Sequence, residues 1–277
     1  MDSQSLLLLA TAFFFGFLAI IIILIESRKR EKHKLTAKKN LADLKEDFTN
    51  MIVHELRAPL ISIKDSSELI ISHKYNLDEK EKKQFLEIIN QQSKLLLDQV
   101  GSILDSAKLE SGKFTLTKIQ DDLGKTIKEQ IKIFLPQATK KHISLTSSIP
   151  SSLPKILIDA IRIRQVINNL ISNSIKFTQE GGTIQVVTYY NPNKNKFITV
   201  SVADTGIGIP KEFQKDLFSK FVQANGTPQK LALQGTGLGL YVIKGIIEAH
   251  GGTVSLESTP GKGTTISFTL PVTLQPN

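Results

Sequence analysis

The feature that most constrains the fold is an uninterrupted apolar run from Leu6 to Ile25, LLLLATAFFFGFLAIIIILI. Its twenty residues, at about 1.5 Å of helical rise each, match the roughly 30 Å hydrocarbon core of a bilayer. A signal peptide would start with basic residues and end at a small-residue cleavage site, whereas this chain starts MDSQS and the run ends in bulky Ile and Leu. A buried core helix is rarely apolar on all sides for this length. The run therefore predicts a transmembrane anchor over residues 1–26.

The positive charge is concentrated directly after this run. The chain has a formal net charge of +9, and residues 26–39 contain seven Lys or Arg against two Glu. Basic residues beside a membrane helix indicate its cytoplasmic end and can contact anionic lipids. We therefore expect a single-pass protein of the cell membrane with its C-terminal domains in the cytoplasm. The basic segment lacks the aromatic residues or recognition motif of a nucleic-acid-binding face, so no nucleic-acid partner is predicted. The absence of cysteine excludes disulfides, thiol nucleophiles and cysteine-bound metals.

Heptad spacing begins in the following segment. Ala37, Leu41, Leu44, Phe48 and Met51 alternate four and three residues apart, which predicts a basic juxtamembrane and coiled-coil linker over residues 27–46.

The pattern continues as two long amphipathic helices within residues 47–113. The first has an apolar stripe made of Phe48, Ile52, Leu56, Leu60 and Ile63. The second begins at Asp78, which forms a capping box with Glu81, and ends near Gly112. Two such helices cannot bury both stripes alone, so we predict a helical hairpin that dimerises into a four-helix bundle. The predicted assembly is a homodimer.

His54 lies on the first of these helices, two residues from both Ile52 and Leu56. Two residues correspond to about 200° around a helix, so the histidine is predicted to face solvent, away from the stripe.

After Gly112 the pattern changes to mixed helix and strand, which predicts a third domain over residues 114–273. Helices are expected near Leu123–Lys140, Asp159–Phe177 and Leu238–His250. Strands are expected in KFTLTKI, HISLTSSI, GTIQVVTYY, KFITVSVAD, GTVSLES and TTISFTLP. The expected fold is an α+β sandwich, one sheet with helices on one face. The polar segment Gln223–Gln234 is typical of a mobile loop.

Three motifs in this third domain could carry chemistry. DTGIGIP, Asp204–Pro210, follows a predicted strand, and its glycines would let the backbone approach a flat ligand; alone it is also typical of an ordinary turn. GTGLGL, Gly235–Leu240, opens a helix whose N–H groups could bind phosphate, but it fits neither a Walker loop nor a dinucleotide fingerprint. In QVINNLISNSIKFT, Asn169, Asn173 and Lys176 share a helix face that could hold a phosphate-bound Mg²⁺ or simply face solvent.

In this order the motifs resemble those of the sensor histidine kinases of two-component signalling, over roughly residues 44–271. HELRAPL is similar to the family's H-box, NNLISNSIKFT to its N-box and DTGIGIP to its first glycine box. FSKF (Phe218–Phe221) resembles the F-box and GTGLGL the second glycine box, while HGGTVSLESTPGKGTTISFTLP is similar to the closing strands. The resemblance implies a phosphoacceptor and dimerisation domain followed by a Bergerat-type ATP-binding domain.

The resemblance also implies roles for individual residues. Asp204 would accept a hydrogen bond from the adenine amino group, Asn173, supported by Asn169, would hold Mg²⁺, and Lys176 would contact phosphate. The pocket and its lid would be shaped by Gly206, Gly208, Gly235, Gly237 and Gly239, with Thr264 at its floor. His54 would attack the γ-phosphate of ATP, and the phosphoryl group would pass to an aspartate of a response regulator. ATP and Mg²⁺ are the implied cofactors.

An exposed histidine suits this chemistry. A histidine side chain with a pKa of about 6.5 is largely a free nucleophile near neutral pH. The adjacent Glu55 could accept or balance the proton on the other ring nitrogen. His33, His73, His142 and His250 lack such a setting and are interpreted as structural or surface residues.

Ala58 lies four residues after His54, where members of the family that dephosphorylate their regulators usually carry Thr or Asn. An alanine side chain cannot orient a water, so weak phosphatase activity is predicted. The alternative is that Ala58 is only a good helix former.

Two other functions compete with the kinase. ATPases of the gyrase, Hsp90 or MutL type share the nucleotide fold but lack an upstream paired-helix segment with His-Glu. A membrane-tethered scaffold with an inactive ATP site would not need the nucleotide-binding residues that this chain carries. Nucleotide binding distinguishes the scaffold from the kinase.

Overall fold

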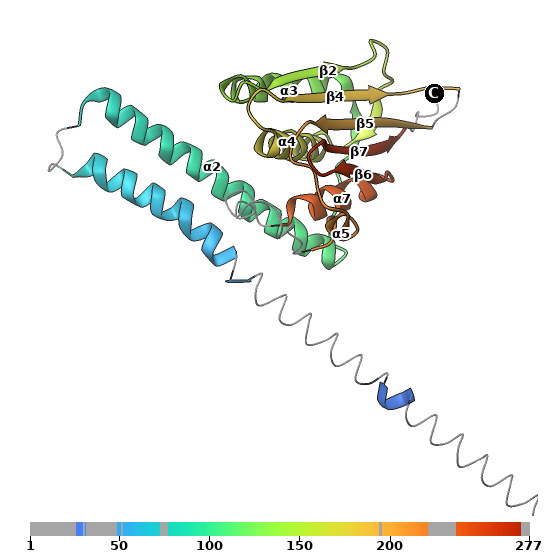
Figure 1. Cartoon of the computed structure of the whole chain (residues 1–277), viewed down its shortest axis with the longest axis horizontal. Coiled ribbons are helices and arrows are strands. Elements are labelled where there is room, and N and C mark those ends of the chain that lie inside the picture. Colours follow the sequence, from blue (N-terminus) through green and yellow to red (C-terminus); the bar gives the residue numbers. More distant parts are fainter. Residues whose placement is uncertain are drawn as a thin grey trace, which may run out of the picture. The chain divides into compact units, whose positions relative to one another are not determined.

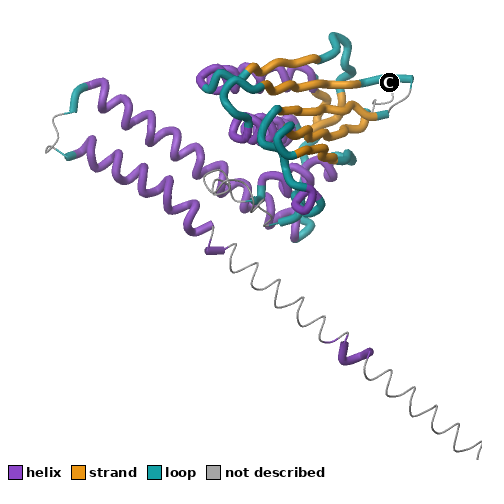
Figure 2. Tube along the Cα trace, in the orientation of Figure 1, coloured by secondary structure: helices purple, strands orange, loops and turns teal. Residues whose placement is uncertain are grey.

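The computed structural model describes residues 26–29, 31, 49–50, 52–72, 77–193, 196–220 and 237–272. The predicted helical hairpin is present: residues 52–71 are helical, and helix α2, Glu79–Glu110, follows (Figures 1 and 2). The predicted capping box begins α2, since the Asp78 carboxylate accepts from the Glu81 N–H and the Glu81 carboxylate from the Asp78 N–H. The helix ends where Gly112 takes a φ of 65°, the left-handed conformation that terminates helices.

A five-stranded sheet forms the centre of the domain predicted over residues 114–273, in the order β2-β4-β5-β7-β6 (Figure 1). Its strands are β2 (Ser144–Ser148), β4 (Thr183–Tyr189), β5 (Phe197–Asp204), β6 (Val254–Thr259) and β7 (Gly263–Pro271). Only β2 and β4 are parallel, and the central pair β5 and β7 places Asp204 opposite Thr264. This register brings the start of the first glycine motif beside the start of the last strand.

Three helices cover one face of the sheet, as predicted. They are α3 (Leu123–Lys140), α4 (Ala160–Phe177) and α7 (Gly239–Ala249), and the short α5 (Lys211–Gln214) lies outside this layer beside β6. Alternate strand residues such as Ile184, Val200 and Phe268 are fully buried under the helices. The α4 residues that face them recur three and four apart, as in an amphipathic helix, and are Ile163, Val166, Ile167, Leu170, Ile171 and Ile175.

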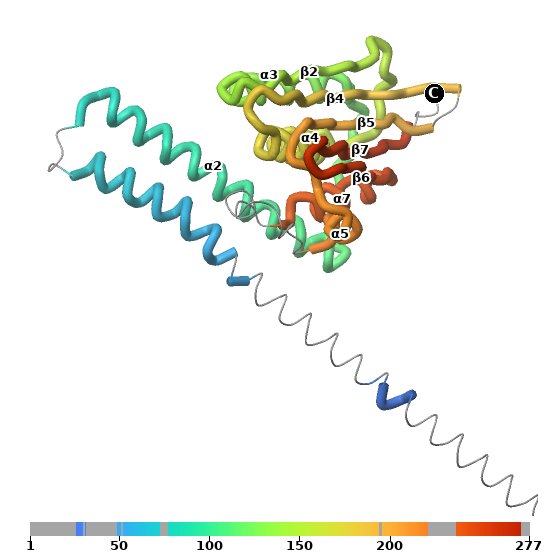
Figure 3. Tube along the Cα trace, viewed as in Figure 1, coloured from blue at the N-terminus to red at the C-terminus, as the bar shows by residue number. Residues whose placement is uncertain are grey.

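The prediction of a single sheet was wrong in one respect. A separate two-stranded sheet pairs β1 (Ile119–Asp121) with β3 (Ile156–Ile158), antiparallel. Most of the predicted strand KFTLTKI is therefore not a strand, because only its last residue joins β1. The segment Ile156–Ile158 pairs with β1, buries two of its side chains and leads directly into α4. Figure 3 colours the chain by residue number and shows the order of these elements.

Three predicted segments lie outside or largely outside the described residues. They are the apolar run Leu6–Ile25, the linker 27–46 and the loop Gln223–Gln234. Within the described part of the chain, no helix has the length and apolar character needed to cross a membrane.

Candidate functional site

Asp204 ends β5, and its carboxylate accepts three hydrogen bonds. Its Oδ1 accepts from the backbone N–H groups of Gly206 at 2.9 Å and Thr264 at 3.2 Å. Its Oδ2 accepts from the Ser174 hydroxyl at 3.0 Å. Burial raises the pKa of Asp204, and these three donors oppose that rise because they stabilise the carboxylate. The carboxylate is thus fixed in orientation, with acceptor capacity left on Oδ2.

The glycines after Asp204 are required by close backbone contacts. A Cβ at Gly206 would lie 2.7 Å from the carbonyl oxygen of Phe177, at the end of α4. Gly208 has a φ of +67°, and a Cβ there would overlap the carbonyl oxygen of Thr259. The loop therefore runs tightly against both α4 and β6, and side chains at these positions would displace it.

Thr264, expected at the floor of the pocket, lies directly beside Asp204. Its backbone N–H, and not its side chain, is what holds Asp204. The hydroxyl of Thr264 lies 2.8 Å from that of Ser258, which in turn accepts from the backbone N–H of Ile209. Ser258 therefore joins the glycine loop to β7, a position that the sequence analysis missed.

Helix α4 presents the predicted polar residues beside its buried face. Asn169, Asn173 and Lys176 are half-buried and recur four and three residues apart. Burial lowers the pKa of Lys176, while the nearby negative charge of Glu55 raises it in part. The Lys176 ammonium lies 4.9 Å from the centre of the Phe177 ring.

The C-terminal end of α4 is capped by a lysine from another helix. The Lys141 ammonium donates to the carbonyl oxygens of Ile175 at 2.7 Å, Lys176 at 3.1 Å and Thr178 at 2.6 Å. Terminal carbonyls of a helix otherwise lack partners, and a cation also suits the negative end of its dipole. Lys141 thus fixes the turn that carries Lys176, and no local pattern in the sequence signals this.

The start of α7 faces the N-box residues. A Cβ built on Gly239 would lie 4.0 Å from the Asn169 amide oxygen. The N-cap residue, Leu238, makes no side-chain hydrogen bond to the first turn, and Gly237 takes a φ of +63°. N–H groups at the start of a helix favour an anion, so a phosphate would fit between α7 and α4. Gly235 lies outside the described residues.

His250, at the end of α7, holds the other end of α4. Its Nε2 accepts from the Asp159 N–H at 3.0 Å, and its Nδ1 lies 2.8 Å from the Ile246 carbonyl, so the ring is neutral with the proton on Nδ1. Asp159 caps α4 through the N–H groups of Ile161 and Arg162. The interpretation of His250 as structural is consistent with this network. Burial is the main cause that lowers the pKa of His250.

We expect His250→Ala to destabilise the domain of residues 114–273 by about 2–4 kcal/mol at pH 8, because it leaves a cavity and an unpaired Asp159 N–H. The pKa of His250 is lower in the folded protein than in the unfolded chain, so the unfolded chain binds more protons as the pH falls below about 6.5. The contribution of His250 to the stability of the wild-type protein is therefore fully present above that pH and declines below it. Thermal unfolding from pH 8 to pH 5 should show the difference between the two proteins narrowing.

His142→Ala is the matched control for this experiment. The His142 side chain is 74% exposed and lies 3.6 Å from the Glu180 carboxylate. Its replacement should change stability by less than about 0.5 kcal/mol. An equal loss in both variants, or a constant difference across the pH range, would contradict the role of His250.

His54 is exposed on its helix, as the spacing predicted, and Glu55 is half-buried. Ala58 is also exposed. His33 and His73 lie outside the described residues.

The described groups fit an adenine nucleotide. They provide a fixed carboxylate acceptor at Asp204, amide oxygens at Asn169 and Asn173, a cation at Lys176 and a helix start at Gly239. Amide oxygens are suitable ligands for a Mg²⁺ that also binds phosphate.

Two family models match the chain. Residues 44–112 match the His Kinase A (phospho-acceptor) domain, and residues 158–274 match the histidine kinase-, DNA gyrase B-, and HSP90-like ATPase domain. The first match distinguishes the chain from ATPases of the gyrase and Hsp90 types.

Individual relatives agree with these matches. The virulence sensor protein BvgS of Bordetella bronchiseptica is 34% identical over 247 residues, which are 88% of this chain and 20% of BvgS. The crystal structure of full-length ShkA in complex with AMPPNP has a TM-score of 0.59 at 26% identity, covering 82% of this chain and 45% of ShkA. The crystal structure of histidine kinase ThkA in complex with response regulator protein TrrA has a TM-score of 0.55 at 25% identity. The match covers 82% of this chain and 61% of the matched chain.

The chain thus spans about a fifth of its curated relative BvgS and less than two thirds of these solved chains. With a phospho-acceptor hairpin followed by an ATPase-type domain, it belongs to the sensor histidine kinase family.

Proposed function

We propose that this protein is a membrane-anchored histidine kinase that phosphorylates its own His54 with ATP and passes the phosphoryl group to an aspartate of a response regulator. The observation that carries the proposal is the presence, on one chain, of an exposed histidine in a phospho-acceptor domain and a fixed Asp204 carboxylate in an ATPase-type domain.

Nucleotide binding follows from the site's hydrogen-bonding groups. Asp204 accepts from the adenine amino group through Oδ2, in an orientation set by Ser174, Gly206 and Thr264. Lys176 and the start of α7 bind the phosphates. Asn173, supported by Asn169, holds the Mg²⁺ that accompanies them. The AMPPNP complex of ShkA supports an ATP-type ligand.

Transfer to His54 needs a nucleophile that is positioned in line with the γ-phosphate. A ring nitrogen of His54 forms a bond to the γ-phosphorus while the bond to the ADP oxygen breaks, and ADP leaves. The other ring nitrogen carries a proton that Glu55, the next residue, can accept or balance. Transfer to the regulator moves the phosphoryl group from the histidine nitrogen to a carboxylate oxygen and frees the histidine.

A label-transfer experiment tests the proposal. The purified full-length chain in detergent is incubated with γ-labelled ATP and Mg²⁺, and the labelled protein is treated with acid and with base. Label that acid removes and base leaves is expected, since a phosphorus–nitrogen bond has this stability. The absence of both label and nucleotide binding would instead favour the scaffold function.

The hairpin supports a homodimer. Large apolar side chains of α2 remain exposed within one chain, with Leu86 at 57%, Leu97 at 71% and Leu104 at 55%. These positions fall within a narrow sector of the helix, given about 100° per residue. A second hairpin packed against them completes a four-helix bundle. The response regulator partner is supported by the complex of ThkA with TrrA.

Membrane attachment is proposed from the sequence. The apolar run Leu6–Ile25 has the length to span a bilayer, and the basic residues that follow it favour a cytoplasmic location for the kinase domains. Fractionation of cells that express the full chain, compared with one lacking residues 1–26, tests this proposal.

Ala58→Thr is expected to raise the rate at which the protein dephosphorylates its regulator, by about tenfold. The position is exposed and lies one helical turn after His54, where a hydroxyl can orient a water. Ala58→Val is the matched control, because valine has nearly the same shape without the hydroxyl. Release of labelled phosphate from a phosphorylated regulator measures the effect. Equal rates for the Thr and Val variants would show that Ala58 does not limit phosphatase activity.

A further inference from the structure

The last turns of α2 contact the ATP-binding domain of the same chain through a buried carboxylate. The Asp105 side chain is only 6% exposed, and its Oδ2 accepts from Arg162 Nη1 at 2.7 Å and from Gln165 Nε2 at 2.9 Å. Arg162 Nη1 also lies 2.9 Å from the Gln165 side-chain oxygen. Arg162 and Gln165 belong to the first turns of α4, the helix that carries the N-box. The three side chains therefore form a hydrogen-bonded connection between the hairpin and the ATP-binding domain.

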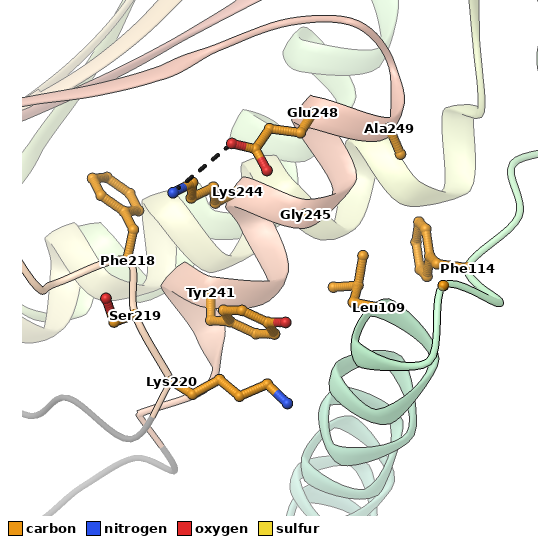
Figure 4. A pocket seen from close by; sticks show the side chains of 11 residues that line it. Leu109, Phe114, Phe218, Ser219, Lys220, Tyr241, Lys244, Gly245, Glu248 and Ala249 are labelled. Carbon is orange, nitrogen blue, oxygen red and sulfur yellow. Dashed lines mark ion pairs between the residues drawn. The ribbon is translucent and has the colours of Figure 1, made fainter. Parts of the chain in front are cut away.

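Further contacts extend this connection to α7. Leu109, one turn after Asp105, packs so closely on Gly245 that a Cβ there would lie 3.0 Å or less from three Leu109 carbons. Figure 4 shows Leu109 directed toward α7, with Phe114 beside it. The Lys220 ammonium lies 2.7 Å from the Glu110 carboxylate and 5.0 Å from the centre of the Tyr241 ring. Two helices of the domain are thus held on the end of α2.

The same α4 helix carries Lys176 near its other end. Lys176, fourteen residues after Arg162 and about 21 Å further along the helix, experiences the charge of Glu55. Residues 55–277 belong to one compact unit, so both interactions occur within it. One helix therefore has its N-terminal turn fixed on α2 and carries Lys176 near its other end.

We propose that Asp105 and Arg162 are positioning residues for autophosphorylation. Their ion pair docks the N-terminal turn of α4 on α2 of the same chain, and so sets the orientation in which the ATP-binding domain presents its nucleotide for transfer. This role rests on the proposed function. Neither residue belongs to the nucleotide site, so losing the pair slows the phosphorylation of His54 and leaves ATP binding unchanged.

The test compares Asp105→Arg, Arg162→Asp and the double exchange in the full-length chain. Each single variant is expected to lower the initial rate of His54 labelling about tenfold, with the KM for ATP within about twofold of wild type. The double exchange is expected to recover at least about a third of the wild-type rate, since it restores opposite charges. Recovery by exchange separates positioning from a general loss of structure.

Two further variants complete the experiment. Glu87→Ala removes an exposed carboxylate from the same helix and should leave the labelling rate unchanged. Gly245→Leu breaks the contact with Leu109 from the α7 side and should slow labelling with unchanged nucleotide binding, even if the Asp105 variants fold poorly.

Two results would overturn the positioning role alone. One is a labelling rate that stays at the wild-type value in the Asp105, Arg162 and Gly245 variants. The other is a rate that rises, which would make the contact inhibitory. If the wild-type chain takes up no label, the proposed function fails, and the positioning role fails with it.

Discussion

Replacing His54 by Gln is expected to lower autophosphorylation by at least about a thousandfold, because glutamine keeps a polar side chain but has no basic nitrogen to attack phosphorus. Nucleotide affinity should be unchanged, since the groups that bind the nucleotide lie on α4, α7 and the Asp204 loop. The measurement is incorporation of γ-labelled phosphate by the full-length chain, together with binding of a fluorescent ATP analogue. Loss of label with normal binding would identify the phosphorylated residue.

The control for this experiment is His142→Gln. The side chain of His142 is 74% exposed, but it lies outside the phospho-acceptor domain. This variant should incorporate label at the wild-type rate. Acid-labile label that persists in His54→Gln would mean that a different histidine is the phosphoacceptor.

Asp204→Asn is expected to weaken ATP binding by about a hundredfold or more, which corresponds to roughly 2.7 kcal/mol. The amide oxygen can still accept from the N–H groups of Gly206 and Thr264, so the loop should keep its conformation. The amide nitrogen then replaces Oδ2 and is a donor, which opposes the donor of the adenine amino group. Titration calorimetry with ATP and Mg²⁺ measures the change, and autophosphorylation should fall in parallel.

Ser201→Ala provides the comparison for this variant. Ser201 lies on the same strand, and its hydroxyl contacts that of Ser267 on β7, away from the loop. Its replacement should leave the ATP affinity within about twofold of wild type. Full ATP affinity in Asp204→Asn would show that the adenine is recognised elsewhere.

The local patterns of the sequence were sufficient to place most helices and strands. Helix α3 has the predicted limits, and the expected strand GTIQVVTYY differs from β4 only at its ends. The capping box of Asp78 and the glycine at position 112 also predicted the limits of α2. These features succeed because capping and periodicity are properties of neighbouring residues.

Long-range partners were not predictable in this way. Three-residue strands such as β3 have too few residues to show a period, and they form because they pair with β1, 37 residues away in register. Lys141, His250 and Asp105 act on residues between 34 and 91 positions distant. Nothing in the neighbourhood of these residues indicates their partners.

The sequence by itself determined the order of the described helices and main-sheet strands and the exposure of His54, because each depends on residues a few positions apart. Tertiary structure alone decided that Ser174 and the backbone of Thr264 orient Asp204, and that Asp105 of α2 binds Arg162 of α4. The physical reason is that hydrogen bonds and ion pairs depend on distances in space. The folding of the sheet and helices sets these distances, and sequence separation does not reveal them.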